Sequence, residues 1–183
     1  MSYYIHNEKK HYSNLLKQQK SSDTIQKIEP TVPAFTYAYK LYYPFLLEHM
    51  PNYNYAEYLQ NLIKSKNQKI NALSLGSGTG DWEIKLVEDF NDIISMELID
   101  INKDLLNVSK NYADKHNLDI TTTEADINKI KLESNKYDLI VVRSSLHHFL
   151  ELEHIFEQIN SSLKPDGNFV VIGEVIGKNG EQI

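Results

Sequence analysis

Three glycines that alternate with hydroxyl side chains form the segment of this sequence best suited to holding a ligand. The stretch NALSLGSGTG places Gly76, Gly78 and Gly80 around Ser77, directly after a short apolar run. Glycine tolerates positive φ and lets a ligand lie against bare backbone. A flexible corner is the simpler interpretation, but a glycine run between a predicted strand and a predicted helix favours a ligand-binding loop.

The spacing of these glycines restricts the ligand. The dinucleotide fingerprint G-x-G-x-x-G needs a small residue at position 81, where this chain has Asp81. A carboxylate at the opening of a helix also repels a pyrophosphate bound there. The pattern present, G-x-G-x-G, fits a cofactor with one nucleoside and no phosphates. A nicotinamide-dependent oxidoreductase is therefore the disfavoured alternative.

The elements that position this loop are predicted from residue 70 onward by alternating strand and helix patterns. Five apolar or β-branched stretches predict strands: INALSL, IISMELID, LDITTTEAD, YDLIVV and GNFVVIGEV. The segment DWEIKLVEDF predicts a helix that buries Trp82, Leu86 and Phe90, and KPDG predicts a turn before the last strand. Near-continuous apolar strands with right-handed crossovers predict an α/β fold with a doubly wound, mostly parallel sheet.

The first third of the chain has a different character. Residues 1–67 are rich in Tyr, Lys, Asn and Gln, with apolar residues at helical spacing and no strand alternation. We expect residues 1–67 to form an N-terminal helical cap on a core of residues 68–183. The tyrosines of this segment could wall a substrate site, although such a stripe more often packs in a core.

Composition limits the partners. The chain has 183 residues and a net charge of −6, which gives no basic field for a nucleic acid backbone. It contains no cysteine, which excludes disulfides and thiolate metal sites. No apolar run approaches the roughly 20 residues that span a bilayer. We expect a cytoplasmic protein with no nucleic acid and no membrane partner.

Five segments, in order, resemble the class I S-adenosylmethionine-dependent methyltransferases over about residues 70–177. LSLGSGTG resembles the family's cofactor loop, LIDINKDLL its second-strand acidic motif and EADI its adenine-side motif. YDLIVVRSSLHHF and LKPDGNFVVIGE resemble its fourth-strand segment and the stretch leading into its fifth strand. The resemblance implies a Rossmann-like core that uses S-adenosyl-L-methionine to methylate a small or medium-sized molecule, for example in specialised metabolism.

The same resemblance implies which residues contact the cofactor. They are Gly76, Ser77, Gly78, Gly80, Asp100, Ile101, Asp126, Ile127 and Arg143. Asp100 is expected to accept from both ribose hydroxyls; its alternative role is a helix N-cap, which Asn102 fits better. Asp126 would accept from the adenine amino group with Ile127 against the ring, or would serve as a cap or turn residue. Arg143 would hold the cofactor's carboxylate.

Several residues near this site depart from the family pattern or leave their role open. The family usually has a carboxylate two residues before the first loop glycine, near the cofactor's ammonium group, and this chain has Ser74. Glu97 is a lesser candidate for the ribose, since its odd offset from Asp100 points it to the opposite face. His147 or His148 could deprotonate an acceptor, or could cap or pack the helix after the fourth strand.

The predicted sheet has fewer strands than the family's seven. Only five strands are expected before IGKNGEQI, and the family's antiparallel hairpin after the fifth is missing. We therefore expect the core to be truncated after the fifth strand, and a missing C-terminal segment or a partner chain to cover that strand. A non-catalytic cofactor-binding module or partner subunit is the alternative function.

Overall fold

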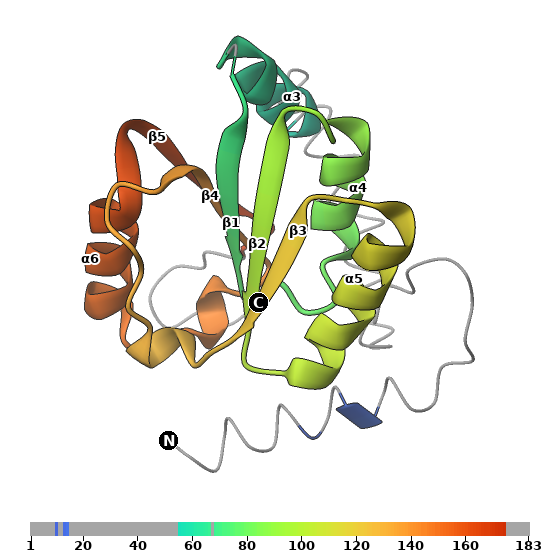
Figure 1. Cartoon of the computed structure of the whole chain (residues 1–183). Coiled ribbons are helices and arrows are strands. Elements are labelled where there is room, and N and C mark those ends of the chain that lie inside the picture. Colours follow the sequence, from blue (N-terminus) through green and yellow to red (C-terminus); the bar gives the residue numbers. More distant parts are fainter. Residues whose placement is uncertain (1–9, 11–12, 15–54, 67, 175–183) are drawn as a thin grey trace, which may run out of the picture. The chain divides into compact units, whose positions relative to one another are not determined.

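The structure, a computed structural model, describes residues 10, 13–14, 55–66 and 68–174 (Figure 1). Two compact units are present: Ile28–Asn67, and Met1–Lys27 together with Gln68–Ile183. Within the first unit, helix α3 (Tyr55–Ser65) buries Leu59 and Ile63, which lie one turn apart. The helical cap predicted over residues 1–67 otherwise lies outside the described residues.

The second unit is built on one parallel sheet of five described strands. These are β1 (Ile70–Leu75), β2 (Ile94–Asp100), β3 (Ile120–Glu124), β4 (Tyr137–Arg143) and β5 (Leu163–Ile172). The strand order is β3-β2-β1-β4-β5, and every pairing is parallel. Because the chain leaves β1 toward β2 on one side and returns to β4 on the other, the switch point lies beyond the carboxyl end of β1. The predicted doubly wound α/β fold is confirmed.

Three helices cover the two faces of the sheet (Figure 1). Helices α4 (Asp81–Asp89) and α5 (Lys103–His116) contact β2 on one face. Helix α6 (Leu152–Ser162) packs on the other face, and two short 3-10 turns follow β3 and β4: η1 (Ile127–Lys129) and η2 (Leu146–His148). Between β3 and β4 the described chain forms η1 and no α-helix. Successive strand residues therefore face α4 and α5, or α6, in turn.

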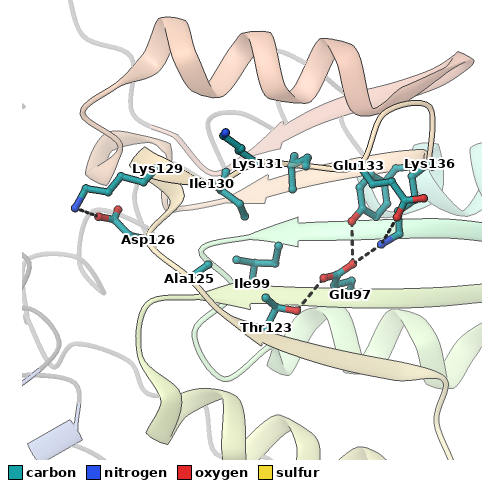
Figure 2. A pocket seen from close by; sticks show the side chains of 12 residues that line it. Glu97, Ile99, Thr123, Ala125, Asp126, Lys129, Ile130, Lys131, Glu133 and Lys136 are labelled. Atoms are coloured by element: carbon teal, nitrogen blue, oxygen red, sulfur yellow. Dashed lines mark hydrogen bonds and ion pairs between the residues drawn. The ribbon is translucent and has the colours of Figure 1, made fainter.

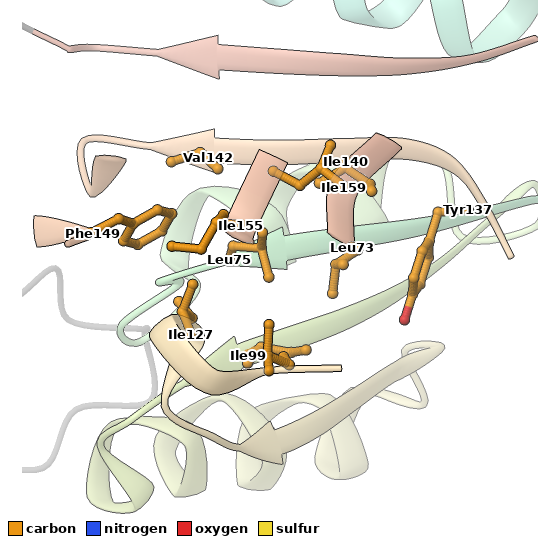
Figure 3. Close-up of a cluster of buried hydrophobic side chains, with 11 residues drawn as sticks. Leu73, Leu75, Ile99, Ile127, Tyr137, Ile140, Val142, Phe149, Ile155 and Ile159 are labelled. Atoms are coloured by element: carbon orange, nitrogen blue, oxygen red, sulfur yellow. The ribbon is translucent and has the colours of Figure 1, made fainter. Parts of the chain in front are cut away.

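The core beneath α6 joins the central strands to that helix (Figure 3). Leu73 and Leu75 of β1 lie with Ile140 and Val142 of β4 against Ile155 of α6, all of them buried. Every residue from Tyr137 to Val142 is buried, as expected for a parallel strand that is covered on both faces. Apolar burial on both sides of β1 and β4 thus holds the switch point in place.

The buried face of α4 differs from the prediction. Trp82 and Phe90 are only half-buried, whereas Glu83, Ile84, Leu86 and Val87 are buried. The apolar positions of this short helix fit two overlapping stripes, and the stripe that faces the sheet contains a carboxylate. Glu83 consequently lies in the protein interior, which our prediction for this helix did not include.

The start of β5 also differs from the prediction. The strand begins at Leu163, before the KPDG segment, which we predicted to be a turn between α6 and the strand. Tyr137 pairs with Leu163, but Leu139 pairs with Asn168, so KPDG lies within a bulge of the ladder. A Cβ at Gly167 would lie 2.9 Å from the Tyr137 carbonyl oxygen, which explains a glycine there. Among the described strands, β5 has a neighbour on one side only.

A buried carboxylate, Asp138, and a half-buried one, Glu97, tie the strands together away from the glycine loop. Asp138 accepts from the backbone N–H of Asn71 at 2.8 Å and from Lys164 at 2.7 Å, which joins β4 to β1 and β5. Glu97 accepts from the Tyr137 hydroxyl at 2.8 Å, and also from Thr123 and Lys136. As predicted from its odd offset, Glu97 points away from the face of α4 and α5.

The Asp138 contacts predict a large loss of stability on truncation. Asp138→Ala leaves a backbone N–H and a partly buried ammonium without their acceptor, which should cost about 2–4 kcal/mol of unfolding free energy. Asp114→Ala removes an exposed i,i+4 pair with Lys110 in α5 and should cost at most about 0.5 kcal/mol. Urea denaturation measures both variants, and equal losses would contradict this role for Asp138.

The Glu97 contacts predict a pH-dependent contribution. Burial raises the pKa of Glu97, but hydrogen bonds from Tyr137, Thr123 and Lys136 outweigh burial and hold the pKa below its usual 4.5. A depressed pKa gives stability that is complete above the unfolded pKa and is lost as the pH falls through the folded pKa. Glu97→Gln should therefore cost about 1–2 kcal/mol near neutral pH.

The difference between wild type and Glu97→Gln should shrink as the pH falls below 4.5, the usual pKa of this group, and through the lower pKa of the folded state. Urea titrations at a neutral and at an acidic pH measure this difference. A gap that stays constant across the two conditions would show that the ionised form of Glu97 contributes nothing specific.

Candidate functional site

The glycine loop leaves β1 at the switch point and leads directly into α4. Gly76, Gly78 and Gly80 have φ values of 70°, 58° and 60°, in the left-handed region that favours glycine. A Cβ at Gly76 would lie 2.8 Å from Ser145, and one at Gly80 would lie 2.6 Å from Leu98. These two glycines allow the loop to pack closely against β4 and β2.

The middle of the loop is open. A Cβ at Gly78 would meet none of the described residues within 4 Å, so the backbone there faces space that the described part of the chain leaves free. The neighbouring Ser77 hydroxyl oxygen is buried and has no hydrogen-bond partner among the described residues. Free space beside bare backbone, next to a buried hydroxyl without a partner, is what a bound polar ligand requires.

Asp100 lies beside this opening, at the end of β2. Its Oδ2 accepts from the Gly78 N–H at 2.9 Å, and its Oδ1 accepts from the Asn102 N–H at 2.7 Å. Asn102, as predicted, is the N-cap of α5 and accepts from the Asp104 N–H at 3.0 Å. The carboxylate is therefore held in one orientation beside the open backbone of Gly78.

Asp126 and Ile127 follow β3 at the same edge of the sheet. Asp126 is the N-cap of η1, with Oδ1 accepting from the Asn128 N–H at 3.0 Å and Oδ2 lying 3.2 Å from Lys129. Burial raises the pKa of Asp126, but these contacts hold it below its usual value. Ile127 is only 7% exposed and belongs to the core beneath α6, while Ile101 is half-buried. Asp126 therefore caps η1, which is the alternative role that the sequence left open for it.

Arg143, the last residue of β4, points across β1 to the start of α4. Its guanidinium lies 3.6 Å from an Asp81 carboxylate oxygen and 5.9 Å from the centre of the Trp82 ring. The side chain is 24% exposed, so one side of it faces solvent. Arg143 thus lies between the glycine loop and the end of β4, where a ligand carboxylate could replace Asp81 as its partner.

Glu83 is a functional candidate that the sequence reasoning missed. Its side chain is 1% exposed, and its Oε1 accepts from the Ser74 hydroxyl at 2.8 Å. Ser74 is the β1 residue that replaces the carboxylate usual in the resembled family. Burial raises the pKa of Glu83, with the Ser74 hydrogen bond and the nearby Arg143 acting in the opposite direction. A carboxylate on the apolar stripe of α4, opposite a serine on β1, was the signal available in the sequence.

The histidine pair lies beyond the ends of β4 and β5. His147 Nδ1 is 2.9 Å from Glu174 Oε2, and the rings of His147 and His148 are 4.0 Å apart, centre to centre. Glu174 Oε1 also accepts from the Leu146 N–H at 2.8 Å. Burial raises the pKa of Glu174, but its hydrogen bonds to His147 and to the backbone hold it below its usual value. Of the two histidines, His147 is therefore oriented by a carboxylate.

A cavity of about 490 Å³ lies between the η1–β4 connection and strands β2 and β3 (Figure 2). Ala125 and Asp126 line one end, and Glu133 and Lys136 line the other. No glycine of the loop lines this cavity, nor does Asp100. The cavity therefore meets the predicted cofactor residues only at Asp126, and the site is better defined by the loop and the strand ends.

These residues fit the cofactor that the sequence implies. Open backbone at Gly78 and a fixed Asp100 carboxylate suit a nucleoside. Arg143 of β4 reaches the start of α4, where Glu83 has one oxygen without a hydrogen-bond partner among the described residues. No described cluster of three or more His, Asp or Glu residues could hold a metal ion. None of the described helices has the length and apolarity needed to cross a bilayer.

Comparison with known proteins extends this finding. The chain is 28% identical over 138 residues to malonyl-[acyl-carrier protein] O-methyltransferase 2 of Ilyobacter polytropus. The matched region covers 75% of this chain and 49% of that protein. It is 25% identical over 113 residues to the ubiquinone/menaquinone biosynthesis C-methyltransferase UbiE of Brucella suis, a match that covers 61% of this chain and 42% of that protein. The chain thus spans about half the length of the curated relatives that it matches.

Solved structures show the same fold. A SAM dependent methyltransferase from Aquifex aeolicus aligns with a TM-score of 0.55 at 19% identity, over 63% of this chain and 61% of that one. Residues 66–179 match the family described as Methyltransferase domain. Because this match covers more than half of the sequence, the chain belongs to the methyltransferase domain family, with the fold of the class I S-adenosylmethionine-dependent enzymes.

Proposed function

We propose that this chain binds S-adenosyl-L-methionine over Gly76–Gly80 and serves in the methylation of a small or medium-sized molecule. The observation that carries the proposal is the open backbone at Gly78, held by the Asp100 carboxylate at the switch point. Membership of the methyltransferase domain family supports the same cofactor. The methyl acceptor and the catalytic activity of the whole protein are also proposals.

The proposed contacts follow from the residues at this edge. Asp100 accepts from the ribose hydroxyls, and Ile101 packs beside the nucleoside. Asp126 accepts from the adenine amino group, with the exposed edge of Ile127 against the ring. Arg143 exchanges Asp81 for the carboxylate of the cofactor's methionine part.

The cofactor, when bound, supplies a methyl group on a sulfonium centre together with its own leaving group. The chain therefore has to align the acceptor and exclude water rather than activate the donor. His147 is suited to take a proton from an acceptor at Nε2, because Glu174 engages its Nδ1 and fixes the ring. The names of the two relatives specify oxygen in one case and carbon in the other, so they do not indicate one acceptor atom.

Calorimetry with S-adenosylhomocysteine and with a nicotinamide dinucleotide tests the cofactor. We expect saturable binding of the first ligand and none of the second. Tight binding of the dinucleotide alone would contradict the proposal. Incubation with a methyl-labelled donor and a panel of small acceptors then separates an enzyme from a binding module, which takes up the cofactor without forming a labelled product.

Asp100 provides the first prediction for a variant of the proposed binding site. Asp100→Ala removes two charge-assisted hydrogen bonds to the ribose and should weaken S-adenosylhomocysteine binding by roughly 2–4 kcal/mol. Asp100→Asn retains one acceptor oxygen and should weaken it by less. Glu97→Gln, on the opposite face of the same strand, is the matched control and should leave affinity unchanged. Equal affinities for wild type and Asp100→Ala would show that another group binds the ribose.

Asp126 provides the second. Asp126→Ala should weaken S-adenosylhomocysteine binding by about 1 kcal/mol, because one hydrogen bond from the adenine amino group is lost. The analogue with unsubstituted purine in place of adenine has hydrogen instead of the amino group, so its affinity should be the same for wild type and variant. A parallel loss for both ligands would indicate that Asp126 acts only as the cap of η1.

A further inference from the structure

Glu83 combines almost complete burial with an incompletely hydrogen-bonded carboxyl group. Its Oε1 accepts from Ser74, but its Oε2 is buried and has no hydrogen-bond partner among the described residues. Removing a carboxylate from water costs several kcal/mol unless it is paired and hydrogen-bonded. Such an oxygen, at an edge of the fold that binds ligands, indicates a partner that arrives from outside the chain.

Glu83 and its hydrogen-bond partner Ser74 lie on the two elements that flank the glycine loop. Glu83 lies in the first turn of α4, which begins directly after Gly80. Ser74 lies on β1 two residues before Gly76, and its hydroxyl fixes the carboxylate at 2.8 Å. The unpartnered Oε2 of Glu83 therefore lies near the carboxyl end of β1, close to the glycine loop and Arg143.

Among the described residues near Glu83, carboxylates outnumber cationic groups, so a bound cation would be stabilised there. Two carboxylates, Asp81 and Glu83, share the single guanidinium of Arg143, which contacts Asp81 at 3.6 Å. An α-amino acid group carries an ammonium and a carboxylate side by side. Arg143 suits the carboxylate, and Glu83 suits the ammonium, whose three N–H donors can reach a carboxylate oxygen as a sulfonium cannot.

We propose that Glu83 binds the α-ammonium group of the cofactor's methionine part, and that Ser74 positions it to do so. This inference rests on the proposed cofactor site and assigns a residue of α4 to it. The carboxylate absent from position 74 of β1 is thereby supplied by the neighbouring helix.

The test is a cycle of two protein forms and two ligands, measured by calorimetry. Wild type and Glu83→Gln are each titrated with S-adenosylhomocysteine and with its analogue that lacks the α-amino group. Glu83→Gln should weaken binding of the amino ligand by about tenfold to a hundredfold. It should change affinity for the desamino ligand little, so that the two effects are coupled.

Further measurements separate ligand binding from a structural role. The melting temperature of ligand-free Glu83→Gln should not fall below that of wild type, because the substitution removes a desolvated charge. Ser74→Ala should weaken binding of the amino ligand several-fold and leave the desamino ligand unaffected. Ser74→Asp combined with Glu83→Gln should restore part of the lost affinity, because it returns a carboxylate to the same end of β1.

The outcomes are distinguishable. Equal weakening of both ligands by Glu83→Gln would overturn the inference and leave the cofactor site intact. Equal affinity of wild type for the amino and desamino ligands would also overturn it, and that measurement needs no variant that folds. Failure of wild type to bind either ligand would overturn the proposed function itself.

Discussion

The hydrogen bond from the Gly78 N–H to the Asp100 carboxylate is the constraint on which the candidate site depends. It ties the loop after β1 to the end of β2, and the N–H groups of Gly76 and Ser77 add bonds to the Ile99 carbonyl. These contacts require β1 and β2 to end at the same level, which their parallel register provides. The conformation that leaves the backbone open at Gly78 therefore depends on the pairing of β1 with β2 as well as on the loop sequence.

Much of this framework could be predicted from the sequence, because apolar periodicity and glycine spacing are local signals. The five strands and the loop between β1 and α4 were predicted in this way. The buried face of α4 was not, because Trp82 and Leu86 form a plausible stripe, whereas the stripe that is buried includes the carboxylate of Glu83. The start of β5 was missed because turn-forming residues such as Pro165 and Asp166 also suit a bulge.

For the candidate site, the sequence indicated at which edge of the sheet its residues lie, but not which contacts they make there. Asp100 and Arg143 lie at strand ends as predicted, since strand boundaries determine their level. Their partners come from other elements: Gly78 holds Asp100, and Asp81 pairs with Arg143. Asp126 engages its own turn. Such pairings depend on the distance between elements that are far apart in sequence, and residue spacing along one strand carries no information about them.

Ser74 and Glu83 show why a missing motif residue is weak evidence for missing chemistry. Position 74 alone suggests that the carboxylate near the cofactor's ammonium group has been lost. The fold places Glu83 of α4 in hydrogen-bonding contact with that same serine, so a carboxylate remains at the end of β1. Its burial disfavours the ionised form while no cation is present, as the raised pKa of Glu83 indicates. Under the proposed assignment, the ligand's ammonium offsets that penalty, and the charge is stabilised only when the site is occupied.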